Sequence, residues 1–273
     1  MSRSIREMFL LLDSNEKIDN SCNENLFGLA ELELAEKKSV TSRRYEQEDI
    51  DIISSYFSQD FNISVLCEPA RLLFEFSIDA SINAFDIFIH AWMSELPIEA
   101  EIIRFGRRVI AAAQAAGSGI DEKQKRVVAA SAAADCGDED TLAVLNAAAK
   151  VQNEIHKMRG LLRFFPENDV YISKCAPDHF ILPALGEYFS ARFGETAWII
   201  IDEKRGLCLN RKHAQDAEIL FYEECPFAAN RAGDEWEELW RHYHKTINNE
   251  SRKNPSLQRQ FMPKRYWKYL NEL

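Results

Sequence analysis

The sequence changes its hydrophobic period at Gly160, and this change constrains the fold more than any other feature. Residues 98–159 are rich in alanine and repeat their apolar positions at helical spacing, with breaks at 117–119 and 136–138 that divide them into three helices. The third predicted helix carries a narrow apolar stripe made of Val144, Ala148, Val151, Ile155 and Met158. Beyond Gly160 apolar residues alternate instead, which is typical of strands.

The region after Gly160 has the pattern of a small sheet with one helix. Four strands are predicted, in two pairs that each enclose a turn: 161–165, 170–174, 197–202 and 207–211. Between the pairs a helix either begins near Pro177 and kinks at Pro183, or begins at Pro183, and it ends at Gly194. We therefore predict an α+β fold: an Ala-rich helical region, then a mostly antiparallel strand–strand–helix–strand–strand unit and a C-terminal helix with a basic tail.

The first hundred residues contain fewer clear patterns. A helix is predicted over 46–57, because Ile50, Ile53 and Phe57 recur at helical spacing. A strand is predicted over 71–76. An apolar helix follows over 80–93, with a buried face made of Phe85, Phe88, Ile89 and Trp92.

The domain organisation follows from these patterns. We expect residues 1–69 to form an extension and residues 70–273 to form a single α+β domain. Within that domain, 98–159 is the helical part and 160–273 holds the sheet and the C-terminal helix. At 273 residues with 46% hydrophobic content, the chain is long enough to build a sizeable core.

Several classes of protein are not indicated by the sequence. The apolar run from Met8 to Leu12 is too short for a membrane span or a signal segment, and we interpret the chain as cytoplasmic. The six cysteines have no C-x-x-C spacing, so we predict reduced thiols, no metal site and no cofactor. Phosphate-loop, dinucleotide, nucleophile-elbow and zinc-protease motifs are missing from the sequence.

The C-terminal end is basic on an otherwise acidic chain. From Arg241 to Leu273 there are eight Lys and Arg against two acids, about +6, whereas the whole chain is −11. Cations interleaved with the aromatic residues Tyr266 and Trp267 indicate a polyanion partner. In nucleic-acid binding the cations contact phosphates and the rings stack on bases. The candidate nucleic-acid-binding residues are Arg241, Lys245, Arg252, Lys253, Arg259, Lys264, Arg265 and Lys268.

An alternative explanation of the same residues is structural. The cations would pair with acids of the chain itself, while Trp267 and Tyr266 would anchor the tail in the core. The preceding helix is predicted to start at Asp234. Its predicted buried stripe consists of Trp236, Leu239 or Trp240, Tyr243 and Ile247.

A second set of candidates lies around the first strand pair. Asp178 and His179 follow a strand and precede a helix, where an acid and an imidazole can serve as general acid or base, and His156 is added as a third catalytic candidate. Arg159 and Arg163 are candidates for binding an anion. The structural alternatives are that Asp178 caps a helix and that His156 and Arg159 complement a helix C-terminus.

Five segments give the chain a family resemblance. They are EIHKMRGLLRF (154–164), APDHFILPAL (176–185), FSARFGETAWIIIDEKRG (189–206), ELWRHYHKTINNESRKNP (238–255) and MPKRYWKYL (262–270). Together they resemble a bacterial family of unknown activity described as probable DNA metabolism or putative DNA repair proteins. In that family the module is sometimes fused to a uracil-DNA glycosylase domain and is often encoded beside a radical-SAM protein thought to act on DNA.

Three hypotheses about function result. The first, which the resemblance favours, is a DNA metabolism or repair accessory protein that binds nucleic acid or a DNA-acting partner, such as a radical-SAM protein or a uracil-DNA glycosylase, through the basic end. The second is a nucleic-acid-processing enzyme with a site near His156, Asp178 and His179. The third is a protein-interaction scaffold that uses the helices of 98–159. No membrane partner is expected.

Overall fold

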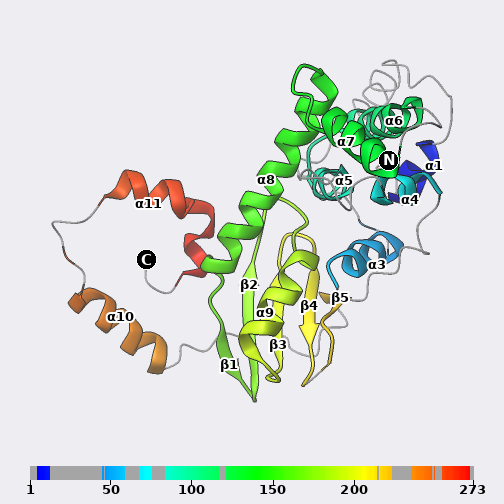
Figure 1. The fold of residues 1–273 in the computed structure, drawn as a ribbon. Coiled ribbons are helices and arrows are strands. Elements are labelled where there is room, and N and C mark those ends of the chain that lie inside the picture. Colours follow the sequence, from blue (N-terminus) through cyan, green and yellow to red (C-terminus); the bar gives the residue numbers. More distant parts are fainter. Residues whose placement is uncertain are drawn as a thin grey trace, which may run out of the picture. The chain divides into compact units, whose positions relative to one another are not determined.

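The computed structural model of the chain consists of two compact units, which we describe separately (Figure 1). The first contains residues 1–49 and 62–150, and the second contains residues 50–61 and 151–273. The structure describes residues 5–12, 45, 47–58, 68–75, 84–116, 121–213, 215–222, 235–247, 249 and 254–270. Among these residues, no helix has both the length and the apolar character that a membrane span requires.

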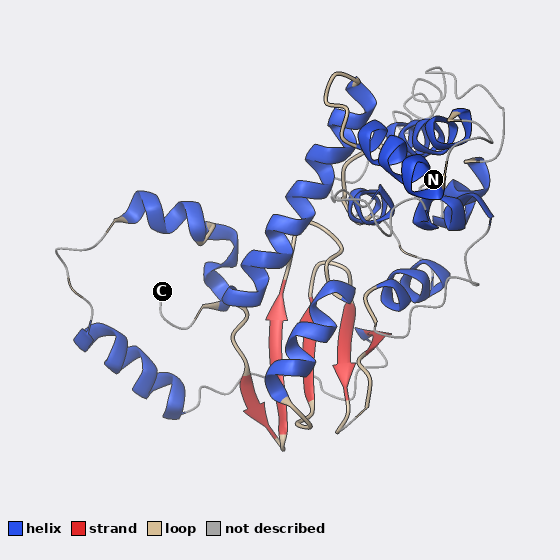
Figure 2. Ribbon diagram, in the orientation of Figure 1, coloured by secondary structure: helices blue, strands red, loops and turns tan. Residues whose placement is uncertain are grey.

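The described part of the first unit is helical (Figure 2). Its helices are α1 (Ile5–Leu11), α4 (Glu68–Glu75), α5 (Ala84–Trp92), α6 (Glu99–Ala115), α7 (Glu122–Ala133) and the first half of α8 (Glu139–Leu161). The ring of Phe9 stacks on Phe85 and Phe88, which joins α1 to α5. A Cβ atom on Gly106 would lie 2.6 Å from a methyl carbon of Leu12, so a larger residue there would require the Leu12 side chain to shift.

Most predictions for the first unit are confirmed, and one is wrong. The three Ala-rich helices are α6, α7 and α8, and all five residues of the predicted stripe on α8 are buried. The predicted face of α5 is also buried. The predicted strand over 71–76 is instead helix α4, because Pro69 occupies a first-turn position and Ala70 and Leu73 are buried at helical spacing.

The second unit contains a five-stranded sheet in the order β1-β2-β3-β4-β5. The strands are β1 (Phe165–Glu167), β2 (Val170–Cys175), β3 (Trp198–Asp202), β4 (Leu207–Arg211) and β5 (Glu218–Phe221). Neighbouring strands are antiparallel except β2 and β3, which are parallel and are connected through the 3₁₀ helix η2 (Pro183–Leu185) and α9 (Gly186–Phe193). Every residue of the central strand β3 is buried, which suits a strand covered on both faces.

The predicted α+β class and the mostly antiparallel strand–strand–helix–strand–strand order are confirmed. The first strand begins later than predicted because α8 continues through Gly160 to Leu161. Asn168 and Asp169 both have positive φ, as a tight hairpin turn between β1 and β2 requires. The helix does begin after Pro183, and Gly194 ends it with φ of 59°. Strand β5, which is not among the four predicted strands, completes the sheet.

The remaining described helices of the second unit are α3 (Gln47–Tyr56, largely in this unit), α10 (Glu235–Ile247), α11 (Pro255–Phe261) and the 3₁₀ helix η5 (Lys264–Tyr269). Helices α3 and α10 confirm two predictions. The buried stripe of α10 is wrong for three of its residues: Leu239, Tyr243 and Ile247 are at least half exposed. An amphipathic pattern identifies a helix without showing what covers its apolar face. The cap residue Asp234 and the side chains of Trp236 and Trp240 lie outside the described residues.

Candidate functional site

The 3₁₀ helix η5 is held by three acids from three separate elements. The hydroxyl of Tyr266 donates a hydrogen bond to Glu154 on α8. The guanidinium of Arg265 lies 2.7 Å from a carboxylate oxygen of Asp178, in the segment after β2. Lys268 and Tyr269 both reach Glu203 in the turn between β3 and β4, at 3.3 and 2.7 Å.

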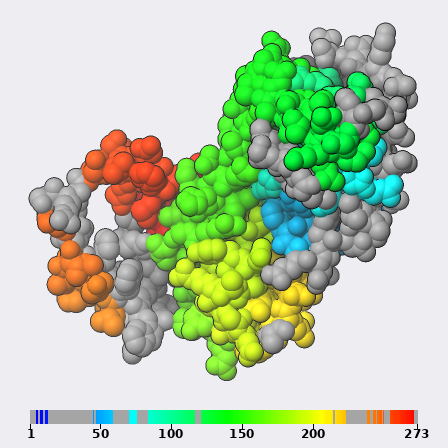
Figure 3. Space-filling view, viewed as in Figure 1, coloured from blue at the N-terminus to red at the C-terminus, as the bar shows by residue number. Residues whose placement is uncertain are grey.

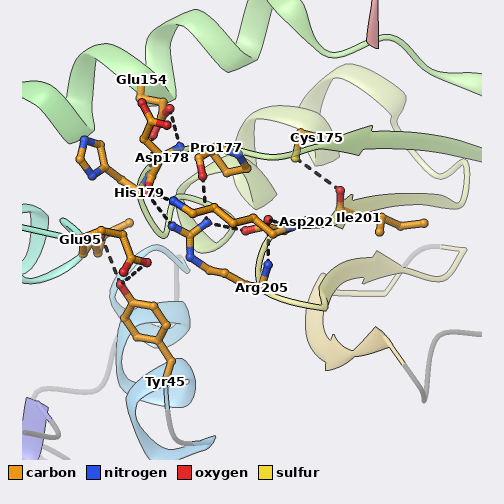
Figure 4. A network of polar contacts seen from close by, with 12 residues as sticks. Tyr45, Glu95, Glu154, Cys175, Pro177, Asp178, His179, Ile201, Asp202 and Arg205 are labelled. Atoms are coloured by element: carbon orange, nitrogen blue, oxygen red, sulfur yellow. Dashed lines mark hydrogen bonds and ion pairs between the residues drawn. The ribbon is translucent and has the colours of Figure 1, made fainter. Parts of the chain in front are cut away.

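Glu154 is the centre of this arrangement, because it is buried and shared by several donors. Its two oxygens accept hydrogen bonds from the backbone amides of Asp178 (2.9 Å) and His179 (2.8 Å), beside which Glu154 lies in Figure 4. Glu154 also accepts the hydrogen bond from Tyr266. Only 5% of Glu154 is exposed, so these partners replace the water that the carboxylate would otherwise bind. Burial and the neighbouring Glu154 raise the pKa of Tyr266, which keeps its hydroxyl protonated as a donor.

A second buried group fixes the same segment from the other side. Arg205 forms an ion pair with Asp202, 2.7 Å apart, and both side chains are almost completely buried. The same guanidinium donates to the carbonyls of Pro177 (3.3 Å) and Asp178 (2.9 Å). Burial raises the pKa of Asp202, and the adjacent Arg205 opposes this shift. The sequence alone predicts only a turn between two strands here, because Arg205 meets residues 177–178 only in the folded chain.

The predicted catalytic pair lies within this framework. The imidazole of His179 is 8% exposed, and burial lowers its pKa, which favours the neutral ring. Figure 4 shows the ring directed away from the Arg205 guanidinium. His156 is exposed on α8, whereas Glu154, two positions earlier, is buried. The residue that contacts Asp178 and His179 from α8 is therefore Glu154, which sequence reasoning missed, and the catalytic assignment stays a prediction.

The two candidate anion-binding arginines make local contacts. Arg163 donates to the carbonyl of Gly160 at 2.8 Å, in the last turn of α8. Arg159 donates to the carbonyl of Ala184 at 3.5 Å, and its guanidinium lies 5.2 Å from the centre of the Tyr188 ring. Arg163 thus bonds to a carbonyl of the last turn of α8, where cations are favoured, whereas Arg159 bonds to a carbonyl outside that helix. Anion binding by these two arginines stays a prediction.

The predicted nucleic-acid-binding cations divide into three groups. Arg265 and Lys268 are paired with Asp178 and Glu203, as the structural alternative predicted. The side chains of Lys245, Arg259 and Lys264 are exposed, and none forms an ion pair with a described residue. The side chain of Arg241, and Arg252 and Lys253 altogether, lie outside the described residues.

Helix α11 begins with Asn254 as its cap and Pro255 in its first turn. The Asn254 side chain caps the helix by accepting a hydrogen bond from the amide of Leu257 at 3.0 Å, and Pro255 occupies the first turn. From Asn254 to Leu270 the sequence contains no acid. Figure 3 shows the atoms of α11 and η5, in red, at the surface beside α8, in green.

The aromatic residues of this segment differ in exposure. Tyr266 is 1% exposed, and the indole nitrogen of the half-buried Trp267 donates to the carbonyl of Met262 at 2.8 Å. Phe261 is 61% exposed at the end of α11. The two rings predicted to stack on bases therefore anchor η5, while a ring that was not predicted is the exposed one.

Two other features of the described residues bear on ligand binding. A pocket of about 380 Å³ in the second unit is bordered by α3, α9 and the segment before β5. Its polar lining residues are Ser54, Ser58, Glu187, Ser190 and Asp216. Within the described ranges, no group of three or more His, Cys, Asp or Glu side chains is arranged to hold a metal ion.

Comparison with known proteins gives one match. A family model described as a domain of unknown function, DUF4130, matches residues 122–272, which is more than half of the chain and extends from α7 to η5. Neither the curated proteins nor the solved structures contain a match to this chain.

Proposed function

The chain belongs to the DUF4130 family, a domain family of unknown function, and from this premise we propose that it is a DNA metabolism or repair accessory protein that binds nucleic acid through its basic C-terminal segment. We define that segment as residues 254–270, which form α11 and η5. The observation that carries the proposal is that this segment has no acid and presents Arg259 and Lys264 to solvent without an ion pair to any described residue.

Electrostatics supports this reading. Protein cations gain affinity for nucleic acid by displacing the counterions condensed on its phosphates, and cations already paired with a carboxylate contribute less. The chain as a whole is −11, which disfavours general coating of nucleic acid and favours contact through a local basic surface. Exposed cations that no described acid neutralises provide such a surface.

The geometry around Asp178 and His179 supports catalysis less well. Both oxygens of Glu154 accept bonds from the backbone of this pair or from Tyr266, and Asp178 is paired with Arg265. His179 is almost completely buried, whereas a general base must reach the proton that it removes. These contacts fit an anchoring role for the acids around η5.

Salt-dependent DNA binding by the full chain tests the proposal. Affinity should fall steeply between about 50 and 200 mM salt, with a slope that reflects the number of phosphates contacted. The double variant R259Q/K264Q should weaken binding. The control K123Q/K150Q removes the same charge from exposed lysines of α7 and α8 and should leave affinity unchanged.

Two outcomes would overturn the proposal. One is the absence of salt-dependent binding to either single-stranded or duplex DNA. The other is equal weakening by R259Q/K264Q and K123Q/K150Q, because that result would assign the effect to net charge and not to the basic C-terminal segment.

A further inference from the structure

Phe261 presents an aromatic ring to solvent at the end of a basic helix. At 61% exposure, it is the most exposed large hydrophobic side chain in the described part of the chain. Leu257, one helical turn earlier, is 48% exposed, so the two form a short apolar edge on α11. Leaving this much apolar surface in water costs free energy, which a ligand could recover by covering it.

The charge around this edge restricts what could cover it. Lys264 follows Phe261 by three positions and is exposed. Arg259, two positions before Phe261, is also exposed but lies on another face of α11, where it donates to the carbonyl of Pro255. The segment has no acid to attract a cationic partner. A ligand that combines negative charge with a flat apolar face therefore complements this surface better than a neutral apolar partner does.

The other rings of the basic C-terminal segment are already engaged. Tyr266 is buried against Glu154, the indole nitrogen of Trp267 is bonded to Met262, and the hydroxyl of Tyr269 is bonded to Glu203. The rings of Tyr266, Trp267 and Tyr269 also each lie under a neighbouring cation, which is Arg265, Lys264 and Lys268 respectively. Phe261 therefore remains as the ring whose face is open to an external group.

Nucleic acid bases have a stacking face that is available only when they are unpaired. In a duplex, both faces of a base are covered by neighbouring bases, whereas single strands bind proteins through exposed aromatic rings interleaved with cations. We propose that α11 selects single-stranded nucleic acid, with a base stacked on Phe261 and the adjoining phosphates bound by Arg259 and Lys264. This inference rests on the proposed function and names its ligand class.

The test compares single-stranded and duplex probes of about 12 nucleotides, a length within the range that single-strand sites cover. The full chain should bind the single strand more tightly than the duplex. F261L should lower single-strand affinity about 5- to 150-fold, the equivalent of roughly 1–3 kcal/mol for one stacked base. F261W should restore it, because tryptophan keeps an aromatic face.

Controls separate stacking from folding and from charge. The unfolding midpoint of F261L should match that of the wild type, since the ring is largely exposed. L257A changes the same apolar edge without removing a ring and should affect single-strand binding less than F261L.

Each failure has its own meaning. Equal binding of single strand and duplex, with F261L and L257A indistinguishable from wild type, would overturn the single-strand inference and leave the proposed function intact. Binding of neither probe would overturn both. Tighter binding to the duplex with loss in F261L would also contradict the inference, because a stacked ring has no free base face there.

Discussion

Helices α11 and η5 are adjacent in the chain, share cations and aromatic residues, and have no acid, yet their surroundings differ. In η5, Arg265 and Lys268 face acids and Tyr266 is buried. In α11, Phe261 is exposed, and the Arg259 guanidinium bonds to the carbonyl of Pro255 in its own helix. Composition alone does not distinguish these two roles. The difference comes from three acids of other elements, Glu154, Asp178 and Glu203. Each of them contacts side chains of η5.

The comparison separates anchoring from binding. A cation that is paired with an acid of its own protein must break that contact before it can bind a phosphate, whereas an exposed unpaired cation need not. Substitutions of the paired residues of η5 and of their acids should therefore change stability. Substitutions of the exposed residues Arg259, Phe261 and Lys264 should change ligand affinity.

Removing the Glu154 carboxylate should have the largest effect. Glu154→Ala leaves the amides of Asp178 and His179 and the Tyr266 hydroxyl without their acceptor in a buried site, and we expect a loss of about 3–5 kcal/mol in the free energy of unfolding. Denaturant unfolding measures this loss. The matched control His156→Ala, on the same helix but exposed, should change stability by less than about 0.5 kcal/mol. Similar losses in the free energy of unfolding for both variants would show that Glu154 does not anchor η5.

Two aromatic substitutions compare η5 with α11 directly. Tyr266→Phe removes one hydrogen bond to a charged, buried acceptor and should lower the free energy of unfolding by about 1.5–3 kcal/mol. Phe261→Leu should change it by no more than about 0.5 kcal/mol. Thermal or denaturant unfolding of both variants measures these losses. A larger loss in the free energy of unfolding for Phe261→Leu than for Tyr266→Phe would contradict the assignment of Tyr266 to the anchor and Phe261 to the binding surface.

The buried imidazole of His179 should make stability depend on pH. Burial lowers its pKa in the folded state below the usual value of 6.5, so the unfolded chain binds the proton more readily. Its contribution is therefore fully present above about pH 6.5 and is lost as pH falls from there toward the folded-state pKa. Unfolding free energies of wild type and His179→Gln should diverge in this direction between pH 7.5 and 5.5. Parallel pH profiles would show that the imidazole does not titrate differently on folding.

The sequence predicted the elements with long or regular patterns. The stripe from Val144 to Met158 and the alternation after Gly160 define α8 and the sheet because burial imposes those periods. Short apolar runs are ambiguous. The run over 71–76 fits a strand or a helix, and its residues 71–75 belong to α4, while the four residues of β5 are too few to separate from a loop. The exposure of the apolar residues of α10 could not be predicted from the sequence. Helical periodicity shows that a helix has an apolar face, but not whether another element packs against that face.

The site was less predictable than the fold because its contacts join distant positions. Glu154 and Tyr266 are 112 residues apart, and Arg205 meets the carbonyl of Pro177 across 28. The pairing of Arg265 and Lys268 with acids could be anticipated from the net charge, since a basic C-terminal end on an acidic chain has many acids available as partners. The sequence does not show which cations are paired or which ring stays exposed. Both depend on the boundary between α11 and η5, which decides which side chains face the acids of the other elements.

The most direct test of the central claim compares two double variants that each remove two positive charges from the basic C-terminal segment. We predict that R259Q/K264Q weakens single-strand binding and reduces the salt slope by about 1.4, or about 0.7 for each lost phosphate contact. R265Q/K268Q should leave the slope close to that of the wild type, because those cations are paired with Asp178 and Glu203. An equal or larger reduction with R265Q/K268Q would contradict the division between exposed cations that bind and paired cations that anchor.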